Sequence, residues 1–466
     1  MRKLTYKEEI VMREIPPLRL ERVLEPVFYT EATMKARKEK VISLMEAEQL
    51  DSLVIYGDME HGSNFEYLTG FVTRFEEGML ILHRDGNACL LLGNENLNKA
   101  GKARINAEAV HVPYFSLPNQ PMEDDAPIET YFRKAGLTQG SKVGLVGWKM
   151  FTSRVENNAG LYDAPYYLVK ALKAVVGAEH LSNKTDLFIG SERGARTVCN
   201  ANEIAHYEFG SQLASAGMLK ALDLIDTGVS EMELGNVMNS CGQPNSVVTI
   251  AAAGPRFEHA NIYPAGKKVT LQDPISLTVG YKGGLSSRAG YAVHQKEELP
   301  EGQRDYLEVL AKPYYAAVVT WLENIRIGMA GGELYRMIEE VMPKETYHWS
   351  LNPGHLVADE EWMSSPIYDG SWETLKSGMM LQIDIIPGLP GYAGVSCESG
   401  IVLADEQLKK EIREQYPKLY EIFEARRDYM KSMLNIDVSG DVLLMNDTVA
   451  YYRPFMLNKR EALAKG

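Results

Sequence analysis

The segment from Gly378 to Asp405 constrains the fold of this chain more than any other stretch. Its apolar residues alternate with polar ones or run in short blocks, which is typical of β-strands. Gly388, Pro390 and Gly391 interrupt this pattern in the middle, where the chain can reverse direction. The segment therefore predicts two strands joined as a β-hairpin.

Three side chains with acid, base or metal-binding chemistry lie in or near this hairpin. Asp384 and Glu398 fall in the predicted strands, and His355 lies upstream in the sequence Asn-Pro-Gly-His-Leu. Because successive side chains of a strand point to opposite faces, the two carboxylates can share one face. Together the three residues suit a hard divalent metal, or acid and base catalysis without one. Taken singly, each is more typical of an ordinary ion pair or structural hydrogen bond.

Length, charge and cysteine content limit the class of protein. The chain has 466 residues, which is enough for two or three domains, and no apolar run approaches the roughly 18 residues of a membrane span. No apolar secretory signal is visible at the start of the sequence. A net charge of −14 disfavours general binding to nucleic acids or anionic membranes. The four cysteines are widely spaced, which favours reduced thiols in a cytoplasmic protein: Cys89, Cys199, Cys241 and Cys397.

Strands and helices alternate through the first part of the chain. The turn Asp85-Gly86-Asn87 favours a hairpin between two of the strands. This alternation predicts an α/β domain that ends near residue 190. The expected elements are a helix around 34–45, strands at 52–57, 79–82, 88–92 and 142–147, and a helix at 166–176.

The second part contains two capping boxes and an internal repeat. Asn200 with Glu203, and Ser230 with Glu233, each predict the start of a helix, the first running to residue 224 or 225. The segment 228–234 recurs at 328–334, and an apolar strand follows each copy at 275–280 and 381–384. The repeat predicts a pseudo-symmetric pair of α-β-β units with a pocket at their junction.

Short motifs along nearly the whole chain point to one family. They are 53–57, 64–71, Gly354-His355, the run from Gly378 to Asp384, the run from Gly394 to Glu398, and 453–457. In this order and spacing they resemble the creatinase, Xaa-Pro aminopeptidase and prolidase family. The resemblance implies a creatinase-like α/β N-terminal domain at 1–190. It also implies an α+β pita-bread domain with pseudo-twofold α-β-β repeats at 191–466.

The resemblance also implies a set of site residues. Metal-dependent members bind two divalent ions through two Asp, one His and two Glu. His355 is similar to the His, Asp384 stands where the first Glu belongs, and Glu398 is similar to the last Glu. Thr278 and Arg288 stand where the two Asp are expected. Since a hydroxyl and a guanidinium do not replace anionic ligands, we expect no metal pair, and a single ion would use the other three residues.

Arg288 is expected to act as a counter-ion in place of the metals. Its planar guanidinium can pair bidentately with Asp384 or Glu398. With Thr278, it is also a candidate substrate-binding residue. A one-residue slip in the alignment would instead turn Arg288 away from the site.

The histidines of the family are displaced in this sequence. The upstream proton-shuttling His of the family falls on Asn261, with His259 two residues away. We expect Asn261 to contact substrate and His259 to be an alternative base. A further family His is replaced near Trp362 or Met363.

Three functions remain open at this stage. The leading hypothesis is a metal-independent hydrolase of a C–N bond in a small amide-, amidine- or dipeptide-like substrate. Creatinase is the family precedent, and here His355 or His259 would accept a proton from water while Asp384 or Glu398 orients it or binds a cationic group. The alternatives are an inactive pita-bread protein that binds a small molecule or protein partner, and a metal-dependent Xaa-Pro peptidase with an atypical ligand set. Family resemblance further implies a homodimer.

Overall fold

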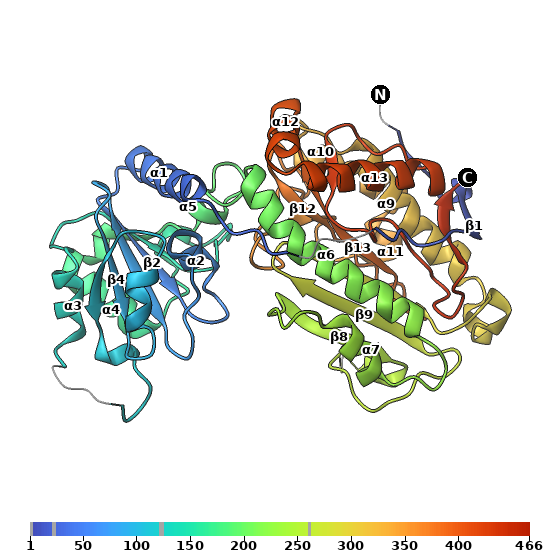
Figure 1. Ribbon diagram of the computed structural model, residues 1–466, viewed down its shortest axis with the longest axis horizontal. Coiled ribbons are helices and arrows are strands. Elements are labelled where there is room, and N and C mark those ends of the chain that lie inside the picture. Colours follow the sequence, from blue (N-terminus) through green and yellow to red (C-terminus); the bar gives the residue numbers. More distant parts are fainter. Residues whose placement is uncertain (1–2, 21–24, 121–124, 260–261) are drawn as a thin grey trace. The chain divides into compact units, whose positions relative to one another are not determined.

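The computed structural model (Figure 1) describes residues 3–20, 25–120, 125–259 and 262–466. The chain divides into two compact units, residues 29–197 and residues 1–28 with 198–466. The first 28 residues, predicted to belong to the N-terminal domain, therefore lie with the C-terminal unit. The reason is that β1 (Ile10–Glu14) pairs antiparallel with β15 (Glu461–Lys465). The other boundary, expected after residue 190, falls after Thr197.

The unit of residues 29–197 is built on a six-stranded sheet with the order β5-β4-β3-β2-β6-β7. Pairing of β2 with β6, β6 with β7 and β4 with β5 is parallel, and β3 pairs antiparallel with both neighbours. The predicted turn at Gly86 joins β3 to β4, which confirms that hairpin. The strands are β2 (Ser52–Gly57), β3 (Gly78–His83), β4 (Ala88–Leu92), β5 (Glu108–His111), β6 (Val143–Val146) and β7 (Leu181–Asn183).

Helices bury both faces of this sheet. On β2, Val54 and Tyr56 pack into one core, while Leu53 and Ile55 are buried on the other face, as strand alternation requires. Side chains of α3 and α4 complete the first core. The helices are α1 (Glu31–Ala47), α2 (Ser63–Thr69), α3 (Ile128–Lys134), α4 (Tyr166–Val176) and α5 (Asp186–Ile189). The predicted α/β architecture of this region is confirmed.

The second unit contains a seven-stranded antiparallel sheet with the order β11-β12-β13-β10-β9-β8, and β14 also pairs with β13. Adjacent pairing of β12 and β13 confirms the hairpin predicted between Gly378 and Asp405. The strands are β8 (Val247–Ala253), β9 (Pro274–Tyr281), β10 (Gly284–Tyr291), β11 (His355–Leu356), β12 (Met380–Ile383), β13 (Ser396–Leu403) and β14 (Val442–Leu444).

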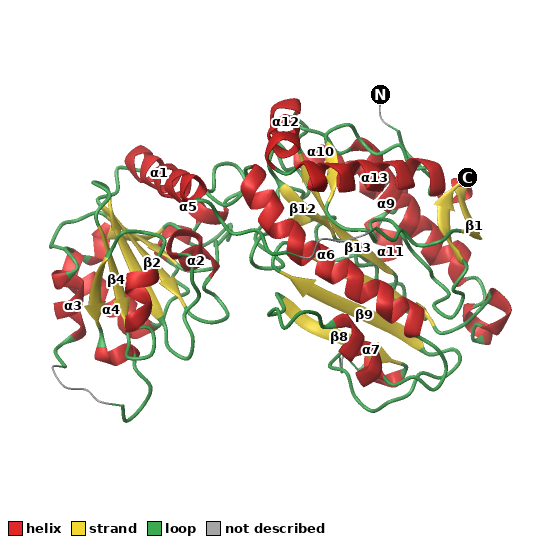
Figure 2. Cartoon of the chain, in the orientation of Figure 1, coloured by secondary structure: helices red, strands yellow, loops and turns green. Residues whose placement is uncertain are grey.

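Helices cover this second sheet. Both predicted capping boxes form, at Asn200 for α6 and at Ser230 for α7, and α6 ends at Leu224 as expected. Figure 2 shows α6 running along the strands, and it contacts β9 and β10. The helices are α6 (Ala201–Leu224), α7 (Glu231–Met238), α8 (Pro255–Glu258), α9 (Lys312–Asn324), α10 (Gly331–Val341), α11 (Lys344–Tyr347), α12 (Glu406–Gln415) and α13 (Pro417–Met433). Among the described residues, no helix is long and apolar enough to cross a membrane.

The two copies of the predicted repeat make matching hydrogen bonds. The Gly228 N–H donates to Val269 O at 2.9 Å, and the Gly328 N–H donates to Leu375 O at 2.9 Å. A β-bridge follows in each copy, Ser230 with Lys268 and Ala330 with Thr374. Each copy joins a long helix to a second, shorter helix, α6 to α7 and α9 to α10. The predicted pseudo-symmetric α-β-β units are therefore present.

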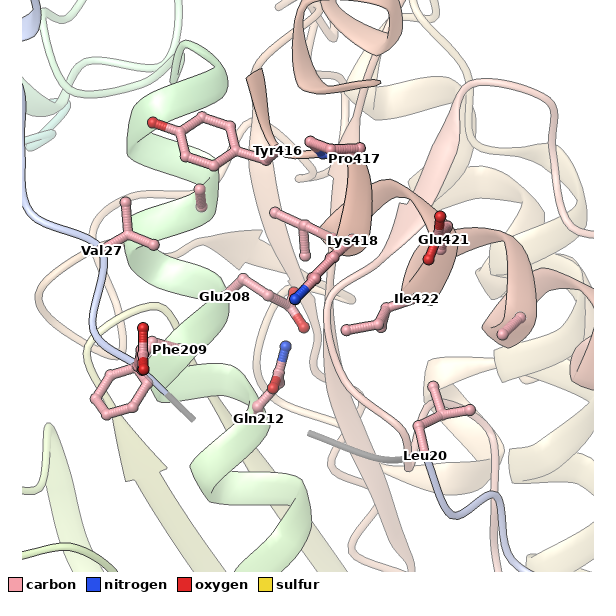
Figure 3. Close-up of a pocket in the computed structure, with 14 residues that line it drawn as sticks. Leu20, Val27, Glu208, Phe209, Gln212, Tyr416, Pro417, Lys418, Glu421 and Ile422 are labelled. Atoms are coloured by element: carbon pink, nitrogen blue, oxygen red, sulfur yellow. The ribbon is translucent and has the colours of Figure 1, made fainter. Parts of the chain in front are cut away.

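A pocket of about 780 Å³ lies between α6 and α13 (Figure 3). Glu208 lines it and is buried, with its Oε1 2.7 Å from an Arg426 nitrogen. Arg426 Nε also donates to Asp447 Oδ1 at 2.8 Å. Burial raises the pKa of Glu208 to about 7. This buried ion cluster links α13 to α6. It shares no residue with the predicted site of His355, Asp384 and Glu398.

A two-residue turn, Lys282-Gly283, joins β9 to β10 and sets their register. Tyr281 pairs with Gly284 across the turn. Gly283 has a φ of +104°, a region that side-chain-bearing residues rarely adopt, and its N–H donates to Ala358 O at 2.7 Å. A Cβ at this position would lie 2.2 Å from Tyr207 O. Only glycine therefore fits this turn.

We predict that Gly283→Ala lowers the free energy of unfolding by about 2–4 kcal/mol, because it combines backbone strain with a clash against a backbone oxygen. Chemical denaturation measures the change. Gly302→Ala is the matched control, since a Cβ there meets no atom within 4 Å, and its effect should stay within about 0.5 kcal/mol. Equal effects of the two substitutions would contradict the assigned turn.

Candidate active site

One row of side chains crosses three strands of the second sheet. Thr278 on β9 pairs with Ser287 on β10, and Ser287 pairs with Glu398 on β13. Directly paired residues of antiparallel strands point to the same face. The two hydroxyl oxygens of Thr278 and Ser287 lie 2.8 Å apart, and all three residues are buried. This face of the sheet is where the predicted site residues gather.

Asp384, directly after β12, and His355 on β11 join the same face. Asp384 follows Ile383, which pairs with Ser399, so its carboxyl lies beside Glu398 and within hydrogen-bonding reach of it. His355 pairs with Gln382, and its Nε2 is 3.8 Å from Asp384 Oδ2. The structure therefore brings together four of the predicted residues: Thr278, His355, Asp384 and Glu398.

Glu361 is a member of the cluster that the sequence analysis missed. Its Oε1 lies 3.7 Å from His355 Nε2, and its side chain is 28% exposed, whereas His355 is 1% exposed. Glu361 directly precedes Trp362, whose ring centroid lies 5.6 Å from that of His355. The expected replacement of a family His near Trp362 was the signal that could have drawn attention to this carboxylate. Glu361 therefore lies on the side of the cluster that is nearest to solvent.

Burial controls the protonation of the cluster. Burial raises the pKa of Glu361 to about 7, with a further contribution from the charge of Asp384. It raises the pKa of Asp384 to about 6, and that of Glu398 well above its ordinary value, where nearby Asp384 adds repulsion. Burial lowers the pKa of His355 to about 4. At neutral pH the imidazole is therefore neutral, and the Asp384–Glu398 pair retains a proton.

The tautomer of His355 follows from its surroundings. Its Nδ1 lies 3.2 Å from Leu356 O. A carbonyl oxygen only accepts hydrogen bonds, so Nδ1 carries the proton and Nε2 presents its lone pair. Nε2 is buried and has no hydrogen-bond partner among the described residues. A neutral imidazole with a free Nε2 can act as a general base.

Arg288 does not serve as the predicted counter-ion. Its guanidinium donates to four backbone carbonyls, those of Tyr451 at 2.8 Å, Ser287 at 2.6 Å, Glu398 at 3.0 Å and Thr448. The predicted bidentate pairing with a carboxylate is wrong, because residue 288 is one position out of the row and points to the opposite face. Ser287 occupies the place assigned to Arg288.

The upstream candidates do not join the cluster. His259 is exposed at the end of α8, and within the described ranges no contact links it to His355, Asp384 or Glu398. Its predicted role as an alternative base therefore lacks support, since a base must reach the reacting atoms. Asn261 lies outside the described residues.

The donor set does not fit a pair of divalent ions. Two ions need several anionic oxygens, and the row offers the neutral hydroxyls of Thr278 and Ser287 beside Glu398. Within the described part of the chain, no three His, Cys, Asp or Glu side chains are arranged as metal ligands.

Two family models match the sequence. "Creatinase/Prolidase N-terminal domain" matches residues 37–157, and "Metallopeptidase family M24" matches residues 205–406. The chain belongs to the creatinase and Xaa-Pro peptidase family. Both parts of the predicted fold class, the creatinase-like domain and the pita-bread domain, are thereby confirmed. The predicted family is confirmed as well.

Solved structures of this family share the fold at low sequence identity. An Xaa-Pro dipeptidase from Bacillus anthracis is 17% identical with a TM-score of 0.60, over 80% of this chain and 96% of that one. A prolidase from Thermococcus sibiricus is 18% identical with a TM-score of 0.62, over 80% and 95%. An X-Pro aminopeptidase from Thermotoga maritima is 16% identical with a TM-score of 0.59, over 79% and 95%. No curated protein sequence matches the chain.

We predict that Thr278→Asp with Ser287→Asp creates a site for manganese or zinc. This double variant places two carboxylates in the row beside Glu398 and so supplies the missing anionic ligands. Metal analysis after dialysis, together with titration calorimetry, measures the gain. Thr278→Asp with Arg288→Asp is the matched control and should gain nothing, because residue 288 faces the other side. Stronger metal binding by the control would show that the row is misassigned.

We further predict that the protein becomes less stable as pH rises from about 4 to 7. Asp384 and Glu361 have folded-state pKa values raised to about 6 and 7, so the folded state holds protons that the unfolded state releases. The stability that these two protonated carboxyls contribute to the folded state is fully present below about pH 4. It is lost as the pH rises through their folded-state pKa values. Asp384→Asn should raise the free energy of unfolding at pH 8 by about 1–3 kcal/mol and flatten the profile. Denaturant titrations at several pH values test this.

The control for the pH profile is Asp428→Asn, which changes an exposed carboxylate on α13. In this variant, the slope of the free energy of unfolding against pH between pH 4 and 7 should be the same as in the parent protein. An equal slope in the parent and in Asp384→Asn would refute the assigned protonation, because the lowered pKa of His355 adds the same opposing slope to both proteins.

Proposed function

We propose that this protein is a hydrolase that cleaves a C–N bond in a small amide-, amidine- or dipeptide-like substrate without a metal pair. The observation that carries the proposal is the buried Nε2 of His355, which presents a lone pair beside the carboxyls of Asp384 and Glu361. The solved structures that share the fold include a dipeptidase, a prolidase and an aminopeptidase, all of which by name cleave C–N bonds.

His355 performs the first step in this proposal. Its Nε2 takes a proton from a water molecule while the water oxygen attacks the carbonyl or amidine carbon. The hydrogen bond from Nδ1 to Leu356 O keeps the ring in the tautomer that this step needs. The imidazolium that forms lies 3.7 and 3.8 Å from Glu361 and Asp384, whose ionised forms stabilise it.

The Asp384–Glu398 pair performs the second step. It retains a proton at neutral pH and donates this proton to the departing nitrogen as the C–N bond breaks. The proton on His355 then returns to the carboxyl pair, so each cycle consumes one water molecule and restores the site. Thr278 and Ser287 contribute hydroxyls to the same face and are proposed to contact the substrate.

The location and assembly are proposed from the family and the composition. Cys89, Cys241 and Cys397 form no disulfide bond within the described residues, which suits the cytoplasm. We propose a homodimer there that acts on small molecules or dipeptides.

We predict that His355→Gln reduces kcat by about 10²–10⁴-fold, the usual contribution of a general base. The assay is a hydrolysis screen of dipeptides, guanidines and small N-acyl compounds, run with and without a chelator beside metal analysis. The chelator should leave the rate unchanged. His259→Gln is the control and should retain parental activity.

Two outcomes would replace the proposal. Activity abolished by chelator, with one ion bound by His355, Asp384 and Glu398, would identify a metal-dependent peptidase. Binding of the compounds without turnover would identify an inactive pita-bread protein that binds small molecules.

A further inference from the structure

Gln382 is a buried amide beside the proposed base. It is 0% exposed, pairs with His355 across β11 and β12, and precedes by two residues Asp384, which directly follows β12. Residues two apart on a strand face the same side, so Gln382 shares the face of Asp384. Neither atom of its amide has a hydrogen-bond partner among the described residues. No role for Gln382 follows from the mechanism above.

Unpartnered polar atoms accumulate at this point of the sheet. Besides both amide atoms of Gln382, they include His355 Nε2 and Asp384 Oδ1, and all three residues are less than 5% exposed. Buried polar atoms in folded proteins are nearly always hydrogen-bonded, because leaving them unpaired is costly. Four such atoms on one face are better explained by a bound ligand than by packing.

The chemistry of these atoms defines that ligand. The lone pair of His355 Nε2 accepts from the attacking water in the proposed mechanism, so the atoms left for the substrate are the Gln382 oxygen, an acceptor, and the Gln382 nitrogen, a donor. Asp384 Oδ1 is a second acceptor when its carboxyl group uses the other oxygen toward Glu398. The matching group therefore carries N–H donors together with an acceptor oxygen or nitrogen. Amides, ureas and amidines that retain hydrogen on nitrogen meet this requirement.

We propose that Gln382 binds the substrate and that the site selects a C–N bond whose nitrogen carries a hydrogen. The proposal rests on the proposed hydrolase function and adds a substrate class to it. A peptide bond to proline lacks this hydrogen, so it would leave the acceptors unpaired. The site therefore discriminates against Xaa-Pro substrates, although the solved structures of the same fold include enzymes named for them.

The test uses two dipeptides that differ in one hydrogen bond donor. Ala-Ala has an N–H at the scissile nitrogen, and Ala-(N-methyl)Ala has a methyl group there; Ala-Pro is the third compound. We expect kcat/KM for Ala-Ala to exceed that of the other two by about 10–100-fold, the effect of leaving a buried acceptor unpaired. If none is hydrolysed, titration calorimetry with the same compounds should give the same order of affinity.

Variants at residue 382 connect this preference to the amide. Gln382→Leu and the unbranched Gln382→Met remove the amide at similar volume and should bring the preference to within about threefold. Gln212→Leu is the control, because Gln212 is also a buried glutamine but lies on α6. It should retain the full preference. Thermal melts verify that each variant is folded.

The results separate this inference from the proposed function. Binding that prefers Ala-Ala without any turnover would refute the hydrolase and support the role of Gln382. The inference would be overturned if Ala-Ala and Ala-(N-methyl)Ala gave equal kcat/KM or affinity. It would also be overturned if the preference for Ala-Ala persisted in both Gln382→Leu and Gln382→Met, or if none of the compounds bound.

Discussion

The pairing of β10 with β9 on one side and β13 on the other determines which side chains form the candidate site. Because the turn Lys282-Gly283 sets Thr278 opposite Ser287, the row that ends at Glu398 contains two hydroxyls. A shift of one residue would have placed Arg288 in that row instead. The close approach of Gly283 to Tyr207 O therefore matters for the site, because it fixes the turn and with it the register. The register places the hydroxyls of Thr278 and Ser287 beside the carboxyl cluster.

The electrostatics of the cluster follow mainly from burial, which outweighs the charge of nearby Arg288 in its effect on the Glu398 carboxyl. Arg288 donates to backbone carbonyls behind the row, so Asp384, Glu398 and Glu361 converge without direct ion pairing to it. Carboxyls in this situation retain protons, and the imidazole of His355 loses its own. One cluster thus contains a neutral base and a carboxyl pair that retains a proton at neutral pH. This combination suits proton transfer to and from a substrate.

The scaffold and the site have diverged to different degrees. The matching hydrogen bonds of Gly228 and Gly328 show that both α-β-β units of the family fold are intact. On their shared sheet, Thr278 and Ser287 offer neutral hydroxyls where the family resemblance implies carboxylates. Hydroxyls and the amide of Gln382 recognise neutral polar groups by hydrogen bonding, whereas carboxylates attract cations. The chain thus combines the family fold with hydrogen-bonding donors and acceptors in the row beside Glu398.

Local patterns in the sequence determined much of the fold, including the capping boxes at Asn200 and Ser230, helix α4 and the β12–β13 hairpin, because each depends on neighbouring residues. They also identified His355, Asp384 and Glu398. The sequence alone did not set the β9–β10 register, although taking Lys282-Gly283 as a two-residue turn would have placed Thr278 opposite Ser287. Only the tertiary structure brought Glu361 to His355 and turned Arg288 toward the carbonyls of Thr448 and Tyr451. The physical reason is that a side chain's face and partners depend on strand pairing between segments far apart in the chain.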